Sequence, residues 1–311
     1  MRKLSCFMAH RVSLHNHSHY SDCWFNRVCD QATPDRIVEN SMNHNIDAVA
    51  VTDTDTDRFF QVLLEQKCVF FNHKSKYQVT PLQGGRVALI TNSRTRKQIY
   101  VYNGIEMHDN STGHIIVVGY EGSLQGKWER FGLEDRLKLG QDSGGIVIAP
   151  HPTTELGIGI PNLEKYAGLI DAAEGFNAKV LTKHFRDKTK ALFEVLFAHK
   201  SANQGAEKAI KRIGMPMIYT SDSNCGQTHL GLIALYDNPT GFQKSSSFEH
   251  IHYVKKHIRD KEFLLVPPTY TNRARFLYEC GWKDIIMPAI RKSEFERRLN
   301  QLREERKKIL L

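Results

Sequence analysis

Residues 12–22 have the sequence Val12-Ser13-Leu14-His15-Asn16-His17-Ser18-His19-Tyr20-Ser21-Asp22, which says most about the fold. It opens with a short apolar run of the kind that forms a buried strand, and it turns polar within a few residues. In an extended strand, residues i and i+2 point the same way, so the imidazoles of His15 and His17 can reach one metal ion. The stretch therefore predicts a strand with a metal site at its carboxyl end.

Six more short apolar runs follow, at residues 48–51, 99–102, 115–118, 145–149, 169–173 and 215–219. Helical patterns separate several of them, and continuous apolar runs of this length are typical of strands buried on both faces. The polar residues found at the ends of the runs are His15, Asp53, Glu106, His151, Glu174 and Asp222. Because the carboxyl ends of the strands in a β/α barrel converge on the face that carries active sites, the pattern predicts an α/β barrel with a polar mouth.

Composition narrows the class of protein. The chain has 311 residues, of which 41% are hydrophobic and 25% charged, as is typical of globular proteins. It has no apolar run long enough for a transmembrane helix, no apolar core of a secretory signal near residue 1, and six cysteines without a C-x-x-C pair. These features predict a cytoplasmic protein with free thiols and no membrane partner.

Positive charge is concentrated in two segments of a chain whose net charge is +9. Residues 61–100 hold seven basic residues and one acid, and residues 291–311 hold eight basic residues and four acids. Such clustering favours an anionic partner, although solvated basic faces are also common. Residues 76–100 contain two β-type runs around a Gly-Gly turn, which predicts a basic β-hairpin inserted near the mouth of the barrel.

We expect three parts in the chain. Residues 1–232 form the barrel with the hairpin insert at about 76–100, and residues 233–290 complete or cap the barrel. Apolar residues at helical spacing predict a basic C-terminal helix over 291–311.

Further motifs follow the first one in order: Thr33-Pro34, Ala50-Val51-Thr52-Asp53, Gly104-Ile105-Glu106, His114-Ile115, Ala149-Pro150-His151-Pro152, Glu174-Gly175-Phe176-Asn177 and Gly214-Met215-Pro216 leading to Ser221-Asp222. The ordered set, spread over residues 10 to about 232, resembles the polymerase-and-histidinol-phosphatase (PHP) family of metal-dependent phosphoesterases. The resemblance implies a distorted (β/α)7 barrel with two or three divalent metals at its carboxyl face.

Carried over position by position, the resemblance implies a two-metal centre. His15, His17, Glu106 and Asp222 would bind the first metal, and Glu106 would bridge to a second metal held by His114 and His151. A carboxylate can bridge two cations, whereas an imidazole is a terminal ligand. Glu106, Asp222 and His151 are the expected catalytic residues, and the metals would be Mn, Zn, Fe or Mg.

The chain departs from the family pattern at two positions, where Thr54 and Asn224 replace histidines. Both histidines belong to the third metal position in the resemblance, which leaves Asp22 as its main protein ligand. We therefore expect two metals, or a third site that is weak and rich in oxygen ligands. Asp53 and Asn224 are expected beside the ligands rather than on a metal.

The resulting hypothesis is a phosphoesterase, either a phosphatase or a nuclease, that hydrolyses an ester of a nucleotide or nucleic acid by a metal-bound hydroxide. Arg86, Arg94 and Arg96 on the hairpin, with Asn177 at a strand end, are the expected substrate-binding residues. One alternative is an amidohydrolase or deaminase, although those enzymes commonly place a lysine where this chain has Glu106. The other alternative is a non-catalytic PHP scaffold that binds nucleic acid.

Overall fold

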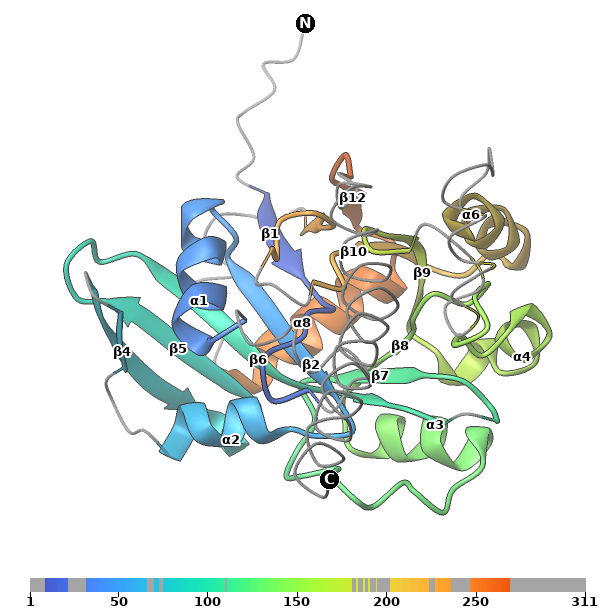
Figure 1. Ribbon diagram of the computed structural model, residues 1–311, viewed down its shortest axis with the longest axis horizontal. Coiled ribbons are helices and arrows are strands. Elements are labelled where there is room, and N and C mark those ends of the chain that lie inside the picture. The colour runs from blue at the N-terminus through green and yellow to red at the C-terminus, as the bar shows by residue number, and fades with distance from the viewer. Residues whose placement is uncertain are drawn as a thin grey trace, which may run out of the picture.

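The sheet that organises the molecule is shown in Figure 1, a ribbon diagram of the computed structural model. The structure describes residues 9–21, 32–65, 70–72, 75–109, 111–180, 202–223, 227–235 and 247–268, with single residues at 183, 187, 190 and 194.

Seven strands form a barrel, in the order β10 (Met217–Thr220), β9 (Ala172–Asn177), β8 (Ile146–Ala149), β7 (Ile115–Val118), β6 (Gln98–Met107), β2 (Ala48–Thr54) and β1 (His10–Ser13). Neighbours pair in parallel except around β7, which is antiparallel to both β6 and β8. A parallel bridge between Asn16 and Ser223 closes the ring, with the Ser223 carbonyl accepting the His17 amide at 2.9 Å. The predicted α/β fold, a distorted seven-stranded barrel, is therefore confirmed.

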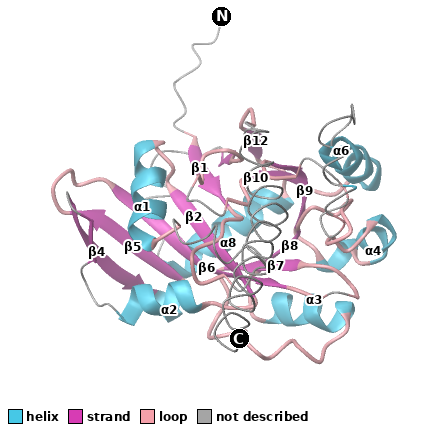
Figure 2. Ribbon diagram, in the orientation of Figure 1, coloured by secondary structure: helices cyan, strands magenta, loops and turns pink. Residues whose placement is uncertain are grey.

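Helices cover the outside of the barrel, as Figure 2 shows. They are α1 (Pro34–Asn43), α2 (Arg58–Glu65), α3 (Leu133–Asp142), α4 (Ile160–Lys165) and α6 (Ala202–Ile213). Their apolar faces are buried in two clusters, one beneath α1 and α2 and the other beneath α3, α4 and α6. This burial of one apolar stripe per helix is what fixes each helix on the sheet.

The predicted hairpin insert is present between β2 and β6. Strands β4 (Ser75–Leu82) and β5 (Val87–Asn92) pair antiparallel around a turn at 83–85, and β5 pairs antiparallel with β6. The turn depends on Gly84 and Gly85, whose φ angles of 65° and 69° favour glycine. A short strand, β3 (Phe70–Asn72), pairs with β4 at the outer edge of this extension.

The amino-terminal end of the barrel is closed by α8 (Ser247–Arg259). Its residues Ile251, Val254 and Ile258 lie in one apolar cluster with inward-facing strand residues such as Val12 and Ile148. The helix approaches so closely that a Cβ on Gly119, just after β7, would lie 2.4 Å from the Ile251 side chain. Glycine at this position is therefore required by the packing of α8.

Strands β11 (Ile233–Leu235) and β12 (Phe263–Leu265) continue the sheet from β1, with both pairings antiparallel. The domain boundaries at 232 and 290 stay predictions, and the helix expected at 291–311 lies outside the described residues. Within the part of the chain that the structure describes, no helix is both long and apolar enough to cross a membrane.

Candidate metal centre

Six predicted metal ligands come together at the carboxyl end of the barrel. They are His15 and His17 just after β1, Glu106 near the end of β6, His114 just before β7, His151 after β8 and Asp222 after β10. Each is at most 7% exposed. Because β7 runs antiparallel, it is the amino-terminal end of this strand that brings His114 to the site.

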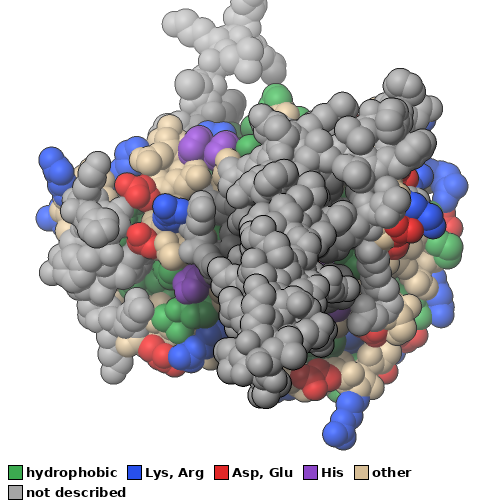
Figure 3. All heavy atoms as spheres, in the orientation of Figure 1, with side chains coloured by type: hydrophobic (Ala, Val, Ile, Leu, Met, Phe, Trp, Pro, Cys, Tyr) green, Lys and Arg blue, Asp and Glu red, His purple; other side chains and the backbone are tan. Residues whose placement is uncertain are grey.

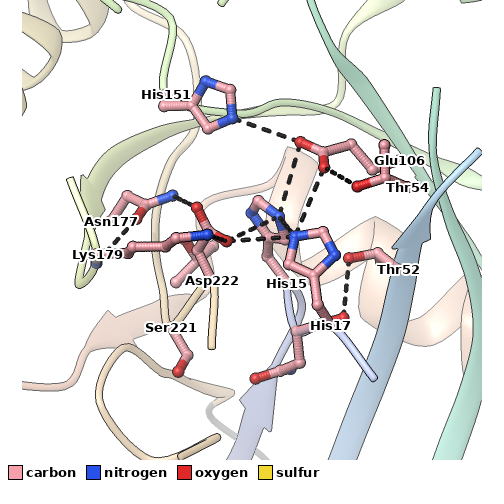
Figure 4. Close-up of polar contacts among 12 residues, drawn as sticks. His15, His17, Thr52, Thr54, Glu106, His151, Asn177, Lys179, Ser221 and Asp222 are labelled. Carbon is pink, nitrogen blue, oxygen red and sulfur yellow. Dashed lines mark hydrogen bonds and ion pairs between the residues drawn. The ribbon is translucent and has the colours of Figure 1, made fainter. Parts of the chain in front are cut away.

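The first group consists of His15, His17 and Asp222. The Nε2 atoms of the two histidines are 3.1 Å apart, and Asp222 Oδ1 lies 3.2 Å from Nε2 of His17 and 3.7 Å from Nε2 of His15. Two ligands at about 2.1 Å from a tetrahedral metal are about 3.4 Å apart. Figure 4 shows the three side chains directed at one another, so their spacing fits a single cation.

The second group consists of Glu106, His114 and His151. Glu106 Oε1 is 2.9 Å from His114 Nδ1 and 3.4 Å from His151 Nε2. Its other oxygen, Oε2, is 3.5 Å from His17 Nε2 in the first group. Glu106 therefore lies between the two groups with one oxygen toward each, as a carboxylate that bridges two cations would.

Two buried polar atoms in the groups have no hydrogen-bond partner among the described residues, Oδ1 of Asp222 and Nε2 of His114. Leaving such atoms unsatisfied is costly unless something else compensates them. The two groups supply imidazole nitrogens and carboxylate oxygens at the spacing of metal ligands. Together with the two unsatisfied atoms, this shows that the residues present fit divalent cations.

Glu174, in the middle of β9, is the buried carboxylate that holds the ligands in place. Its Oε1 lies 2.6 Å from His15 Nδ1, and its Oε2 accepts the backbone amide of His151 at 2.8 Å. The Asn177 amide donates to Glu174 Oε2 and to Asp222 Oδ2, at 2.8 and 3.0 Å. The sequence motif contained Glu174, but its contact with His15, 159 residues away, had no local signal.

The metal-free cluster is dominated by carboxylates, and the pKa shifts reflect this. Burial disfavours the charged form of His15, but Asp222, Glu174 and Glu106 outweigh burial and raise its pKa to about 9. Burial also opposes ionisation of Glu106, yet His114, His151 and His15 hold its pKa well below the usual range. For Asp222, Lys179 and the two histidines of its group likewise overcome burial and lower the pKa.

The backbone is strained where two of the ligands sit. His151 has φ of 31° and Asp222 has φ of 45°, a region that residues other than glycine seldom adopt. Strain of this kind persists where the surrounding structure enforces it, often at functional sites.

Lys179, which was not predicted from the sequence, places its positively charged ammonium group at the site. Its Nζ lies 3.7 Å from Asp222 Oδ1, and its side chain is 16% exposed. Figure 4 shows the two side chains facing each other. The Asn177 side chain accepts the backbone amide of Lys179 at 3.0 Å and so shapes the turn after β9 that presents this lysine. The predicted substrate residue Asn177 thus lies at the site, where it contacts the ligands.

Of the other residues considered near the centre, the structure describes Asp53 and Thr54. Asp53 accepts hydrogen bonds from the backbone amide and the hydroxyl of Ser18, at 2.5 Å each, and so supports the loop after the histidine pair. Thr54 donates to Glu106 Oε2 at 3.2 Å. Asp22 and Asn224 lie outside the described residues.

The structure does not bring the three predicted arginines to this centre. Arg96 lies two residues before β6 begins, whereas Glu106 lies eight residues into that strand, about 26 Å further along at about 3.3 Å per residue. Arg94 is in the same exposed turn. Arg86 donates to Glu121 and to the Ser143 carbonyl at the α8 end of the barrel. For Arg94 and Arg96, the expected place near the mouth was wrong because β5 runs antiparallel to β6, so the turn between the two strands lies at the start of β6.

Among the described side chains, Lys and Arg do not gather at one place on the face drawn in Figure 3. They are spread around its periphery and interspersed with Asp and Glu.

No family model and no curated protein matches this chain. Solved structures do match. PsfC from Pseudomonas syringae PB-5123 has a TM-score of 0.51 and 16% identity, over 87% of this chain and 96% of its own. The lesion-specific endonuclease PfuEndoQ from Pyrococcus furiosus has a TM-score of 0.50 and 14% identity, over 86% of this chain and 60% of its own.

A two-domain protein from Bacteroides vulgatus ATCC 8482, described as containing a predicted PHP-like metal-dependent phosphoesterase, is also similar. It has a TM-score of 0.47 and 14% identity, over 84% of this chain and 65% of its own. This chain thus spans 65% and 60% of the length of two of these neighbours. At these identities the likeness is one of fold.

Proposed function

We propose that this chain is a metal-dependent phosphoesterase that hydrolyses a phosphate ester of a nucleotide or nucleic acid. The observation that carries the proposal is the pair of ligand groups that share Glu106 at spacings fitted to two cations. Two cations held by carboxylate and imidazole ligands on either side of one carboxylate are the arrangement of two-metal phosphoryl transfer.

The residues of this chain prepare the site for that chemistry. When bound, the cations supply an activated water and neutralise charge on the phosphoryl oxygens. Glu174 holds Nδ1 of His15, and Ser21 Oγ lies 3.2 Å from Nδ1 of His17, so the Nε2 atoms face the site. Glu106 keeps the two groups at a fixed separation, which suits an in-line displacement at one phosphorus.

Lys179 is the protein cation placed to bind the substrate. A metal bound to Asp222 Oδ1 would neutralise part of the negative charge that Lys179 faces at 3.7 Å. The ammonium group of Lys179 could then also pair with a non-bridging phosphoryl oxygen of the substrate. A fixed positive charge at that point stabilises the charge that develops on the phosphoryl group.

The nucleotide part of the proposal has two supports. The net charge of +9 favours polyanionic partners, and one structural neighbour is named as an endonuclease. The amidohydrolase alternative has weaker support, because the bridging position holds Glu106 and not a lysine.

The test is hydrolysis after removal of metals with a chelator and addition of Mn²⁺, with p-nitrophenyl phosphate, bis(p-nitrophenyl) phosphate and a single-stranded oligonucleotide as substrates. We expect turnover that depends on Mn²⁺ and disappears in Glu106→Gln, but persists in the control Glu164→Gln on the exposed surface of α4. Absence of turnover with every ester and every divalent cation tried would contradict the proposal and favour the scaffold alternative.

A further inference from the structure

A cavity of about 390 Å³ opens beside the metal centre and contains none of its six ligands. Its lining comes from three segments, the loop after the histidine pair, the start of α2 and the loop before α3. The lining residues are His19, Tyr20, Ser21, Asp55, Thr56, Arg58 and Gln125. The volume falls in the range of pockets that bind small ligands.

The cavity shares a wall with the ligand groups. The Ser21 hydroxyl lies 3.2 Å from Nδ1 of His17 and accepts the Thr54 amide at 2.9 Å. On the same wall, the backbone amide of Asp55 donates to the carbonyl of Glu106 at 2.9 Å. The cavity therefore lies directly behind His17 and Glu106, next to the place where a substrate would be held.

Five of the lining side chains have a use in binding a nucleoside. The rings of His19 and Tyr20 lie 3.9 Å apart and tilted by 39°, and they offer aromatic surface for a base. The guanidinium of Arg58 can stack on or donate to a base, and the amide of Gln125 can pair with its edge. Asp55 adds a carboxylate suited to accepting hydrogen bonds from the hydroxyls of a pentose.

The charges argue against a simple anion as the occupant. Asp55 places a negative charge in the cavity, and its Oδ1 accepts the His108 amide at 2.8 Å, which keeps the carboxylate in place. Arg58 pairs with Glu65 at 3.4 Å, but both side chains are about half exposed, so this pair is weak and leaves the guanidinium able to turn to a ligand. A neutral, aromatic and hydroxylated group fits this mixture better than a phosphate alone.

We propose that this cavity binds the nucleoside part of the substrate, with an aromatic base against His19 and Tyr20 and a pentose near Asp55. The inference rests on the proposed function, because it supplies the substrate class of that site. It predicts that the enzyme favours nucleoside phosphates over phosphate esters without a base.

The test compares ligands with and without the base. Binding of adenosine, which needs neither metal nor phosphate, is measured by calorimetry, and KM is measured for adenosine 5′-monophosphate and for ribose 5-phosphate. In Tyr20→Ala we expect the Kd for adenosine and the KM for the nucleotide to rise at least about tenfold, the loss expected for one stacked base. The KM for ribose 5-phosphate should change less than about twofold.

Two controls separate the cavity from general damage. Tyr166→Ala removes a partly exposed tyrosine next to α4, and Arg94→Ala removes an exposed arginine at the far end of the barrel, so neither should change the Kd. If Tyr20→Ala fails to fold, as judged by circular dichroism, Gln125→Ala on the exposed rim replaces it with the same expectation.

The outcomes distinguish this inference from the proposed function. Turnover of both esters with equal kcat/KM, unchanged in Tyr20→Ala, would overturn the cavity assignment and leave the phosphoesterase standing. Adenosine binding that is lost in Tyr20→Ala, without turnover of any ester, would support the cavity and overturn the phosphoesterase. Absence of adenosine binding to the unaltered protein would also overturn the assignment.

Discussion

The two ends of the barrel bury carboxylates in opposite ways. At the amino-terminal end, the side chain of Asp171 is fully buried and accepts hydrogen bonds from the Val147 amide and Gln141, and it pairs with Lys255 and Arg259 of α8. At the carboxyl end, Glu106, Glu174 and Asp222 are equally buried. There the neighbours are mainly histidines, and Asp222 Oδ1 has no hydrogen bond within the described residues.

The difference shows which end is built for stability and which for chemistry. The chain supplies its own cations where a helix must be fixed to the barrel, so that the charge of Asp171 is compensated. At the other end, Lys179 and protonated histidines such as His15 compensate the carboxylates, and metal cations from solution can replace those histidine protons. The same strands thus carry, at one end, buried charges that the chain compensates by itself and, at the other end, a polar cluster that fits metal ions.

Glu106→Gln should have the largest effect and should affect the carboxyl end alone. The loss of the bridging charge should lower metal-dependent turnover at least about 1000-fold, equivalent to about 4 kcal/mol. Because His114, His151 and His15 stabilise the charged form of Glu106, the metal-free protein should lose some stability, but less than in Asp171→Asn. Steady-state kinetics and urea unfolding measure the two effects, and a large fall in stability would contradict the comparison.

Asp171→Asn should lower the stability of the protein through the amino-terminal end of the barrel and leave the carboxyl end unchanged. It leaves Lys255 and Arg259 without their buried partner, and breaking such a pair typically costs about 3 kcal/mol. We expect the midpoint of urea unfolding to fall while metal content stays unchanged. The control is Asp142→Asn, at the exposed end of α3, which should alter neither quantity.

Lys179→Met should separate metal binding from catalysis at the carboxyl end of the barrel. Without the ammonium beside Asp222, kcat/KM should fall about 10- to 100-fold, because one charged contact to the phosphoryl group is lost. The number of bound metals should not change. Lys183→Met, an exposed lysine nearby in the chain, is the control, and a loss of metal in Lys179→Met would show that the lysine has a structural role instead.

The pH dependence of stability should differ between metal-free and metal-loaded protein. The folded pKa of His15, about 9, is above the unfolded value of 6.5, so its stabilising effect is complete below pH 6.5 and is lost as pH rises toward 9. From pH 6.5 to 7.5 the metal-free protein should lose about 1 kcal/mol. With metal bound, His15 is neutral and the trend should reverse, because a higher pH leaves fewer protons to compete with the metal for its ligands. Thermal unfolding at several pH values, with and without Mn²⁺, measures both trends, and parallel curves would contradict this account.

The sequence could predict the residues gathered at the carboxyl end, because each lies at or beside the end of a strand. His15, Glu106 and Asp222 were identifiable from motifs of a few residues, and the barrel then brings those motifs together. Whether they bind metal stays a prediction.

The rest depended on long-range structure. Lys179 faces Asp222 because of a turn that Asn177 shapes, and a lysine in a loop gives no sign of its direction. Arg94 and Arg96 were misplaced because charge counts do not say to which end of a barrel a hairpin delivers its turn. The position of α8 at the amino-terminal end is set by packing between segments far apart in the chain, such as Gly119 against Ile251.

The most direct test of the account is a calorimetric titration of chelator-treated protein with Mn²⁺. We predict two cations per chain in the unaltered protein, the loss of one in Asp222→Asn, and weakened binding of both in Glu106→Gln. No binding to the unaltered protein, or a stoichiometry that neither substitution changes, would contradict the claim that the carboxyl end of this barrel is completed by two metal ions.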